Sequence, residues 1–148
     1  MIEYKELTKE HVKDIAEIYV DAFNSEPWND QWTVESAYKR ISQMLNCEGF
    51  DGLVVYEEEK MVGMILGNHE YYYNGMHFHI KEFCVDLKLR GKGIGAQLIE
   101  EFINRLKNKG IGEIILFTSR GDGTEGFYKK HGFESFDSMV MMGKQIQK

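Results

Sequence analysis

The chain has 148 residues, of which 43% are hydrophobic and 28% charged, and its formal net charge is −6. This length and composition predict a soluble globular protein with one sizeable core, so we expect a single domain over residues 1–148. The negative charge argues against nucleic-acid binding, because a phosphate backbone attracts a basic face. Nowhere do about 18 apolar residues run together, which argues against a membrane span, and we expect a cytoplasmic protein.

The cysteines indicate neither a disulfide framework nor a metal site. Cys47 and Cys84 are the two cysteines of the chain, and they lie far apart in the sequence. Neither belongs to a C-x-x-C pair or to a cluster with histidines. We therefore expect idle or buried thiols and no bound metal.

The first part of the chain predicts one strand and two helices. Residues 2–7 predict the strand, and Thr8 is a suitable N-cap for a helix over residues 8–23. Apolar residues recur through that helix at helical spacing, at Val12, Ile15, Ala16, Tyr19, Ala22 and Phe23. A second helix begins at another cap residue, Thr33, and continues to about Leu45.

The segment between these helices, residues 24–32, is unusual for a solvated loop. It holds the single proline of the chain together with Trp28 and Trp32. Large aromatic side chains either line a ligand pocket or fill a core. We expect this loop either to line the pocket of an acceptor substrate or to plug the core.

The middle of the chain predicts a hairpin over residues 53–56 and 61–67. The acidic run between its strands predicts a solvated turn. Three tyrosines follow at positions 71–73, just before the next strand. Because consecutive residues on a strand alternate between its faces, at least one of these tyrosines lies outside the core. Contact with a ligand and cross-strand packing are both open for Tyr72 and Tyr73.

The strand predicted over residues 77–85 contains a break in its alternation. Phe78 and Ile80 are apolar at even positions. Farther along, Phe83 and Val85 are apolar at odd positions. One inserted residue between the two pairs, a β-bulge, restores the alternation, and bulges are common beside active sites. With that bulge, the face opposite the apolar set carries His77, His79, Glu82 and Cys84.

Residues 85–98 predict the end of a strand, a glycine-rich turn and the start of a helix. Glycines at 91, 93 and 95 let the backbone turn tightly without Cβ clashes. They leave bare N–H groups at a helix N-terminus, where the dipole favours an anion, and Arg90 and Lys92 add positive charge. The pattern indicates a phosphate-bearing ligand, although an ordinary strand-to-helix turn can have the same glycines.

The remaining chain predicts a strand, a short helix and a closing strand. The helix after the glycines continues to Lys107, with Gly110 as its stop, and residues 113–118 predict a mostly buried strand. Residues 124–131 predict a short helix, and residues 133–142 a strand that closes the sheet. That last strand would place three methionines in the core or at the sheet edge, at positions 139, 141 and 142.

Two segments of the chain resemble motifs of one enzyme superfamily. Residues 90–95 resemble the acetyl-CoA signature of the GCN5-related N-acetyltransferases (GNAT), Q/R-x-x-G-x-G/A, with the sequence Arg90-Gly91-Lys92-Gly93-Ile94-Gly95. Residues 127–133 are similar to the later F-Y-x-x-x-G-F segment of that superfamily. Two motifs at the usual separation are more specific than either motif alone.

The resemblance implies the GNAT fold, an α/β (α+β) architecture. Its central sheet would be mixed, mostly antiparallel, and made of about six to seven strands, with about four flanking helices. One parallel pair of strands would splay apart and open a slot for the pantetheine arm of the cofactor. The bulge predicted from the alternation of residues 77–85 agrees with this expectation by a separate argument.

The resemblance also implies direct acetyl transfer from acetyl-CoA to a primary amine. The amine could belong to a polyamine, an aminoglycoside, an amino acid or a protein, and a homodimer is compatible with the fold. Many members carry an asparagine upstream of the tyrosine in the later motif, where this chain has Gly121, so Ser119 or Arg120 would substitute for it. The residues expected to bind the cofactor are Cys84, Val85, Arg90, Gly91, Lys92, Gly93, Ile94, Gly95, Ala96 and Ser119.

An acetyltransferase site needs a base, because an alkyl amine is mostly protonated at neutral pH. Glu82, on the ligand face of the bulged strand, is the first candidate, and His79 or a water relay is the alternative. Each also fits a structural role, Glu82 as an ion-pair partner and His79 as a packed strand residue. Tyr128 matches the general-acid tyrosine of the superfamily, and backbone N–H groups around Val85 would polarise the thioester carbonyl.

Two other functions fit parts of the pattern. Residues 91–96 satisfy G-x-G-x-x-G/A, but a dinucleotide-binding motif belongs after an early strand, and here it lies past mid-chain. A non-catalytic acetyl-CoA sensor or interaction module on the same fold is the stronger rival, because fold does not fix function. The presence of Tyr128 and Glu82 favours the enzyme.

Overall fold

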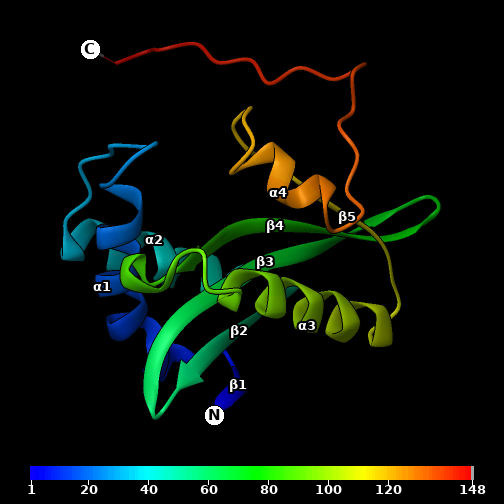
Figure 1. Cartoon of the computed structure of the whole chain (residues 1–148). Coiled ribbons are helices and arrows are strands. Elements are labelled where there is room, and N and C mark those ends of the chain that lie inside the picture. The colour runs from blue at the N-terminus through cyan, green and yellow to red at the C-terminus, as the bar shows by residue number, and fades with distance from the viewer. Residues whose placement is uncertain (148) are drawn as a thin grey trace. The chain divides into compact units, whose positions relative to one another are not determined.

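Figure 1 shows the computed structural model of the chain, in which residues 1–147 are described. The chain divides into two compact units, Met1–Phe117 and the part from Thr118 onward. The first unit contains a sheet with helices on both faces, and the second contains one short α-helix within its described residues.

Up to α4, the helices and strands follow the predicted order. The strands of the first unit are β1 (Ile2–Glu6), β2 (Phe50–Glu57), β3 (Lys60–Tyr72), β4 (Gly75–Val85) and β5 (Ile111–Leu116). Its α-helices are α1 (Val12–Phe23), α2 (Val34–Leu45) and α3 (Ile94–Asn108). Short 3-10 turns cover Lys9–His11 and Leu87–Leu89, and the helix of the second unit is α4 (Glu125–Lys129).

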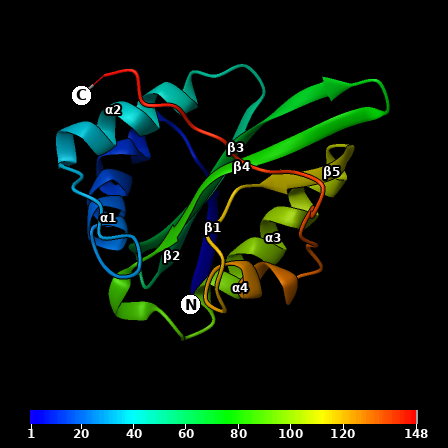
Figure 2. The same cartoon turned by 90° about the horizontal axis from the view of Figure 1, so that it is seen from above.

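A single mixed sheet with the strand order β1-β2-β3-β4-β5 organises the first unit. Neighbouring strands run antiparallel except β4 and β5, which are parallel and are connected through α3. Helices α1 and α2 cover one face of the sheet, and α3 covers the other (Figure 2). The α/β class and the mixed, mostly antiparallel sheet are therefore confirmed.

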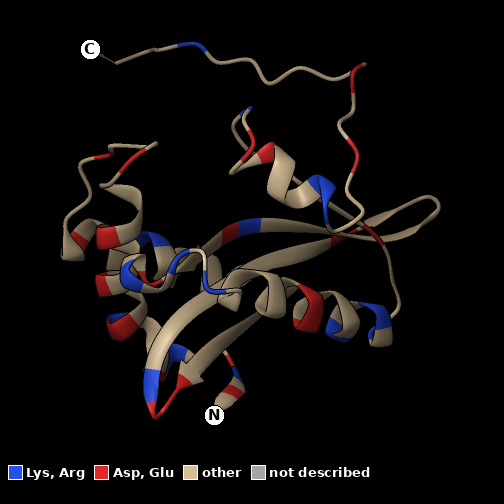
Figure 3. Cartoon of the chain, viewed as in Figure 1, with Lys and Arg blue, Asp and Glu red and all other residues tan. Residues whose placement is uncertain are grey.

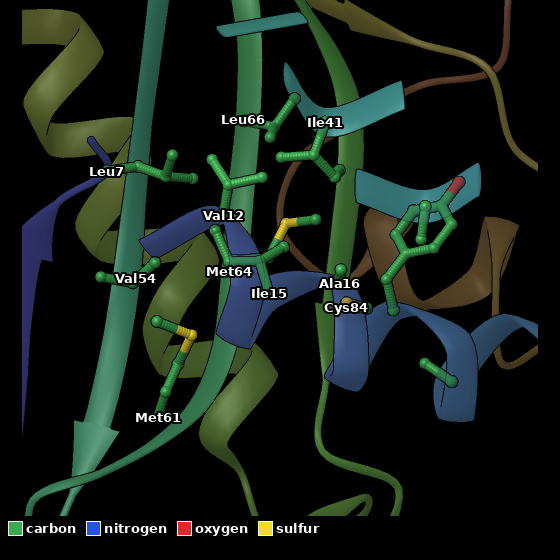
Figure 4. Close-up of a cluster of buried hydrophobic side chains, with 13 residues drawn as sticks. Leu7, Val12, Ile15, Ala16, Ile41, Val54, Met61, Met64, Leu66 and Cys84 are labelled. Atoms are coloured by element: carbon green, nitrogen blue, oxygen red, sulfur yellow. The ribbon is translucent and has the colours of Figure 1, made fainter. Parts of the chain in front are cut away.

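The core under α1 shows why this segment is helical. Val12, Ile15 and Ala16 share one helical face and point toward the strands (Figure 4), where Met64 and Leu66 are fully buried. Burial of one large aliphatic side chain contributes about 1.5–3 kcal/mol, so this face holds α1 against the sheet.

No helix among residues 1–147 is both long and apolar enough to cross a membrane.

Local capping sets the helix ends. The Thr33 side chain accepts a hydrogen bond from the Ser36 N–H at 3.0 Å, and the Ser36 hydroxyl accepts one from the Thr33 N–H at 2.9 Å. This reciprocal pair starts α2 at the predicted position. After Thr8, the chain makes the 3-10 turn first, so α1 itself begins at Val12. Gly110, at a φ of +87°, follows the end of α3 as predicted.

The predicted bulge in β4 is confirmed. Leu66 pairs with Glu82, whereas the next residue of β3, Gly67, pairs with Ile80, so Lys81 is the extra residue. Opposite residues of a ladder share a face of the sheet. Glu82 and His79 therefore lie on the face of Leu66, under α1 and α2, while Phe78 and Ile80 lie on the face covered by α3.

The sheet has five strands instead of about six to seven, because the predicted strand over residues 133–142 does not form. Ser135 hydrogen-bonds to the Glu125 carboxylate, and the Met139 N–H donates to the Phe136 carbonyl in a turn. The turn interrupts the segment, and none of residues 133–142 belongs to a strand. The expected burial of its methionines is also wrong, since the exposed fractions of Met139, Met141 and Met142 are 71–84%.

Candidate functional site

The glycine turn, residues 90–95, connects β4 to α3. Gly91 and Gly93 adopt φ values of +81° and +87°, and Gly93 is the N-cap of α3. The first helical bond runs from the Gln97 N–H to the Gly93 carbonyl. Among residues 1–147, the N–H groups at positions 91 and 93–96 donate to no backbone carbonyl. Bare N–H groups at the N-terminus of a 15-residue helix form a place for an anion.

The space above the turn is open. A Cβ atom built on Gly91 or Gly93 would meet no other atom within 4 Å, so a ligand can approach the backbone itself. Lys88, Arg90 and Lys92 all lie in the segment between β4 and α3, so this segment carries positive charge close to the turn (Figure 3). The electrostatics and the geometry of the turn both favour a negatively charged ligand.

The Arg90 guanidinium has contacts that the sequence did not predict. Its Nη2 donates to the Ala22 carbonyl at 2.9 Å, and its Nη1 donates to the Glu26 carbonyl at 3.3 Å. The same guanidinium lies over the Trp28 ring, 5.5 Å from the ring centre. Arg90 thus joins the glycine turn to the loop after α1.

The two tryptophans of residues 24–32 have different environments. Trp32 meets the Tyr19 ring edge-on at 5.0 Å and packs against the core. Trp28 packs on Phe23 at 4.9 Å but keeps 37% of its surface exposed. Trp32 therefore fills the core, as one of the two expectations had it, and Trp28 is the tryptophan with surface left for a ligand.

Glu82 is buried under the helices and held by two donors. The Tyr19 hydroxyl donates to its Oε2 at 2.8 Å, and the Arg40 Nε donates to the same oxygen at 2.5 Å. Burial and the nearby Glu82 charge raise the pKa of the Tyr19 phenol, so Tyr19 stays a neutral donor. Every fully buried side-chain N or O atom among the described residues has a partner, so Oε1 of Glu82, which accepts no hydrogen bond, still reaches solvent.

His79 is the neighbour of Glu82 on the same face, since their partners Asn68 and Leu66 are two residues apart on β3. Its ring meets Phe117 edge-on at 4.9 Å, and within residues 1–147 its ring nitrogens have no hydrogen bond. Burial and the positive charge of Lys81 lower the pKa of His79, so the ring is neutral at pH 7. A neutral imidazole with a free nitrogen can accept a proton.

Cys84 lies in the core cluster with α1, and its side chain is 7% exposed. Burial raises the pKa of this thiol far above its ordinary value, with the charge of Glu82 as a second cause, so Cys84 is not a nucleophile. Only its backbone, together with that of Val85, could contact a ligand. Within the described residues, no group of three His, Cys, Asp or Glu side chains is placed to hold a metal ion.

The parallel ladder between β4 and β5 is short. It runs from the Met76–Ile111 pair to the Ile80–Leu116 pair and ends there, at the bulge. The rest of β4, which leads to Val85 and the glycine turn, continues its ladder with β3 alone. Since β5 itself ends at Leu116, the part of β4 beyond the bulge has no strand partner on its β5 side among the described residues.

Tyr72 and Tyr73 lie at the opposite end of β4 from the glycine turn. Tyr72 pairs with Gly75 at the tip of the β3–β4 hairpin, and Tyr73 is fully exposed. At about 3.3 Å per residue, roughly 30 Å of strand separates this tip from Val85. The structure thus does not bring these tyrosines to the turn, and Tyr72 instead stacks on His77 at 4.0 Å.

The second unit holds Tyr128 on α4. The Phe133 N–H donates to the Tyr128 carbonyl and the Gly132 N–H to the Lys129 carbonyl, and this pair of bonds ends the helix in a Schellman motif. The Tyr128 ring contacts Phe127 at 5.3 Å and Phe133 at 5.5 Å. The later motif is therefore a helix, its glycine stop and an aromatic cluster.

Ser119 lies at the start of the same unit, in the loop before α4. Its carbonyl accepts from the Thr124 hydroxyl at 2.6 Å and from the Glu125 N–H at 3.2 Å. These bonds close the loop over residues 119–125 and fix the beginning of α4. The Ser119 hydroxyl has no hydrogen bond among residues 1–147, so it is available to a ligand.

The comparisons with known proteins agree with this geometry. The chain matches the Acetyltransferase (GNAT) family over residues 12–133. It is also 31% identical over 103 residues to the chloroplastic GCN5-related N-acetyltransferase 2 of Arabidopsis thaliana. That match covers 70% of this chain and 38% of the plant protein, so the chain spans well under half of that relative. The chain belongs to the acetyltransferase (GNAT) family.

Solved structures share the fold. A possible acetyltransferase from Clostridium difficile 630 has a TM-score of 0.83 at 19% identity, with 99% of each chain covered. A predicted acetyltransferase with acetyl-CoA from Clostridium acetobutylicum has a TM-score of 0.71 at 17% identity, with 97% of this chain and 96% of that chain covered. At these identities the likeness shows the fold alone.

Proposed function

We propose that this chain is an N-acetyltransferase that moves an acetyl group directly from acetyl-CoA to a primary amine. The observation that carries the proposal is the glycine turn, where N–H groups at the N-terminus of α3 donate to no backbone carbonyl. Such a terminus binds phosphate groups, and CoA carries a pyrophosphate. Membership of the GNAT family supports acetyl-CoA as the donor.

The residues of the turn fit this cofactor. The open space above Gly91 and Gly93 would admit the pyrophosphate to the backbone, and the exposed Lys92 would add a positive charge. The end of the β4–β5 ladder would expose the backbone at Cys84 and Val85 to the thioester arm. The remaining residues proposed to hold the cofactor are Ile94, Gly95, Ala96 and Ser119.

Acetyl-CoA supplies an activated carbonyl, and the chain must supply a base and an acid. We assign the base to His79, whose neutral ring is free to take the proton that the ammonium of the acceptor loses. Glu82 was the first candidate from the sequence, but its Oε2 is already occupied by Tyr19 and Arg40, which leaves Oε1 as the alternative base. The Tyr128 hydroxyl gives a proton to the departing thiolate, so that CoA leaves as a thiol.

Both units are proposed to form one acetyltransferase domain, because the family match spans residues 12–133 and thus includes part of each unit. The acceptor would be a primary amine, with Trp28 as the loop residue that contacts it. Candidate acceptors are polyamines, aminoglycosides, amino acids and protein amines.

Calorimetric titration with acetyl-CoA tests the cofactor site. Gly93→Val should weaken binding by about tenfold or more, because a β-branched residue is strained at a positive φ and its side chain fills the approach to the turn. Gly93→Asn is the matched control, since asparagine tolerates this backbone region better and should lose less affinity. Unchanged affinity in a folded Gly93→Val variant would place the cofactor elsewhere.

An amine panel scored by release of free CoA tests the activity itself. Turnover on one class of amine would identify the acceptor. Binding of acetyl-CoA without turnover on any amine would instead favour the sensor function, because a sensor needs the cofactor site but no base.

A further inference from the structure

We propose that Arg90 is a positioning residue that fastens the Trp28 loop, residues 24–33, to the glycine turn, and so couples the acceptor side of the site to the cofactor side. The role in catalysis rests on the proposed function. The mechanical link between loop and turn does not, and it can be measured separately.

The contacts of Arg90 carry this inference. Its two hydrogen bonds go to carbonyls at the end of α1 and within the Trp28 loop, those of Ala22 and Glu26. Within residues 1–147, Arg90 donates both of the hydrogen bonds that join the loop region to the glycine turn. The Ala22 carbonyl lies in the last turn of α1, where a cation is favoured by the helix dipole.

The Trp28 loop is folded tightly enough to move as one piece. The Asn24 side chain binds both ends of the Trp32 backbone, accepting from its N–H at 2.8 Å and donating to its carbonyl at 2.9 Å. The Asp30 N–H donates to the Phe23 carbonyl, and the Asn29 N–H donates to the Ser25 carbonyl. Arg90 holds this loop at Glu26 and Trp28, and the internal hydrogen bonds therefore restrain the rest of the loop as well.

The chemistry of arginine distinguishes this role from phosphate binding. A planar guanidinium can donate in two directions while it lies on an aromatic ring, whereas a lysine ammonium is a compact point charge. If Arg90 served only as a positive charge for phosphate, lysine would replace it. If it spans two carbonyls and covers Trp28, lysine cannot replace it.

Hydrogen exchange with mass spectrometry on the full chain is the direct test. In Arg90→Lys, peptides over residues 24–33 should exchange about tenfold faster than in the wild type, because the loop loses hydrogen bonds that oppose its opening. Lys92→Gln is the matched control, since it removes a charge from the same turn and should leave the exchange of the loop unchanged. Equal exchange in Arg90→Lys and the wild type would overturn the proposal.

Addition of acetyl-CoA tests the coupling. A saturating amount should slow exchange of residues 24–33 in the wild type but not in Arg90→Lys, and calorimetric affinity should fall more in Lys92→Gln than in Arg90→Lys. A greater loss of affinity in Arg90→Lys would make Arg90 a phosphate ligand and contradict the inference. If the wild type does not bind acetyl-CoA, the proposed function fails. The exchange rates of the unliganded loop in Arg90→Lys and the wild type still test whether Arg90 links the loop to the glycine turn.

Steady-state kinetics give a second readout once an acceptor is known. Arg90→Lys should raise the KM for the amine about tenfold and leave the KM for acetyl-CoA within about threefold of the wild type. A general loss of folding would instead raise the KM values for both the amine and acetyl-CoA. A change confined to the KM for acetyl-CoA would contradict the positioning role.

Discussion

Tyr128 contacts Phe127 and Phe133 through its ring, so its hydroxyl can be removed without removing the packing. Tyr128→Phe should lower turnover by about 10- to 10³-fold, because a thiolate leaves tolerably without a proton donor. The free energy of unfolding should change by no more than about 1 kcal/mol, and acetyl-CoA affinity should stay near that of the wild type. Turnover, urea unfolding and calorimetry on the same variant check this. Weak binding with normal turnover would instead make Tyr128 a binding residue.

The choice of base is decided by the pH dependence of turnover. His79→Gln should lower kcat/KM by about 10²-fold at neutral pH and recover at high pH, where the amine deprotonates unaided. Glu82→Gln keeps an oxygen acceptor for Tyr19 and Arg40. In this variant kcat/KM should still decrease at acidic pH as it does in the wild type, and this decrease is the acidic limb of the pH profile. Loss of that limb in Glu82→Gln, with the limb intact in His79→Gln, would return the role to Glu82.

Histidine titration also gives stability a pH dependence with a definite sign. Burial lowers the pKa of both His79 and His11 below the ordinary value of 6.5. The unfolded chain therefore binds these protons first as the pH falls below 6.5, and the native state is destabilised. The free energy of unfolding should be highest above pH 6.5 and decrease on acidification. Chemical denaturation at several pH values should show a shallower decrease in His79→Gln, and an equal slope would contradict this account.

At the scale of elements, the bulge in β4 depends on a glycine in the neighbouring strand. A Cβ on Gly67 would lie 2.0 Å from the His79 carbonyl oxygen and 2.8 Å from the Phe78 ring. Gly67→Ala should therefore destabilise the protein by about 3 kcal/mol or more, or prevent folding, because the clash is with backbone. Gly112→Ala in β5 is the control, as its Cβ would meet nothing closer than 3.7 Å. Similar urea midpoints for both variants would contradict this.

The bulge was predictable because it shifts the apolar residues of the strand from even to odd positions. The switch from even to odd positions after Ile80 records the extra residue directly, and the register assigns it to Lys81. The need for glycine at position 67 was not predictable, because it arises from the approach of a partner strand. Caps such as Thr33 were predictable for the opposite reason, since they involve residues only three positions apart.

At the scale of the whole molecule, the features that the sequence did not predict are contacts between residues that lie far apart in the chain. Alternation placed Glu82 on the correct face, but its partners Tyr19 and Arg40 are 63 and 42 residues away in the sequence. The contacts of Arg90 with Ala22 and Glu26 span 68 and 64 residues. No local pattern records such pairs. The sequence therefore allowed an ion pair at Glu82 without naming its partner, and it gave no sign of the contacts of Arg90.

The wrong strand over residues 133–142 has a similar cause. Its apolar residues satisfy the composition of a strand, but a strand exists only when a neighbour accepts its backbone bonds. Local bonds of Ser135 and Met139 take precedence in the structure. Alternation can thus indicate which residues share a face, but it cannot supply the partner.

The exposed methionines of this segment have a chemical consequence. A thioether that meets solvent is oxidised to a sulfoxide, which turns a flexible apolar side chain into a polar one. Dilute peroxide should oxidise Met139, Met141 and Met142 well before the buried Met61 and Met64, and peptide mapping over time should show this order. Simultaneous oxidation of both groups would contradict the exposure. Mild oxidation would thus convert the methionines of this segment to sulfoxides while the methionines in the core of the sheet stay unmodified.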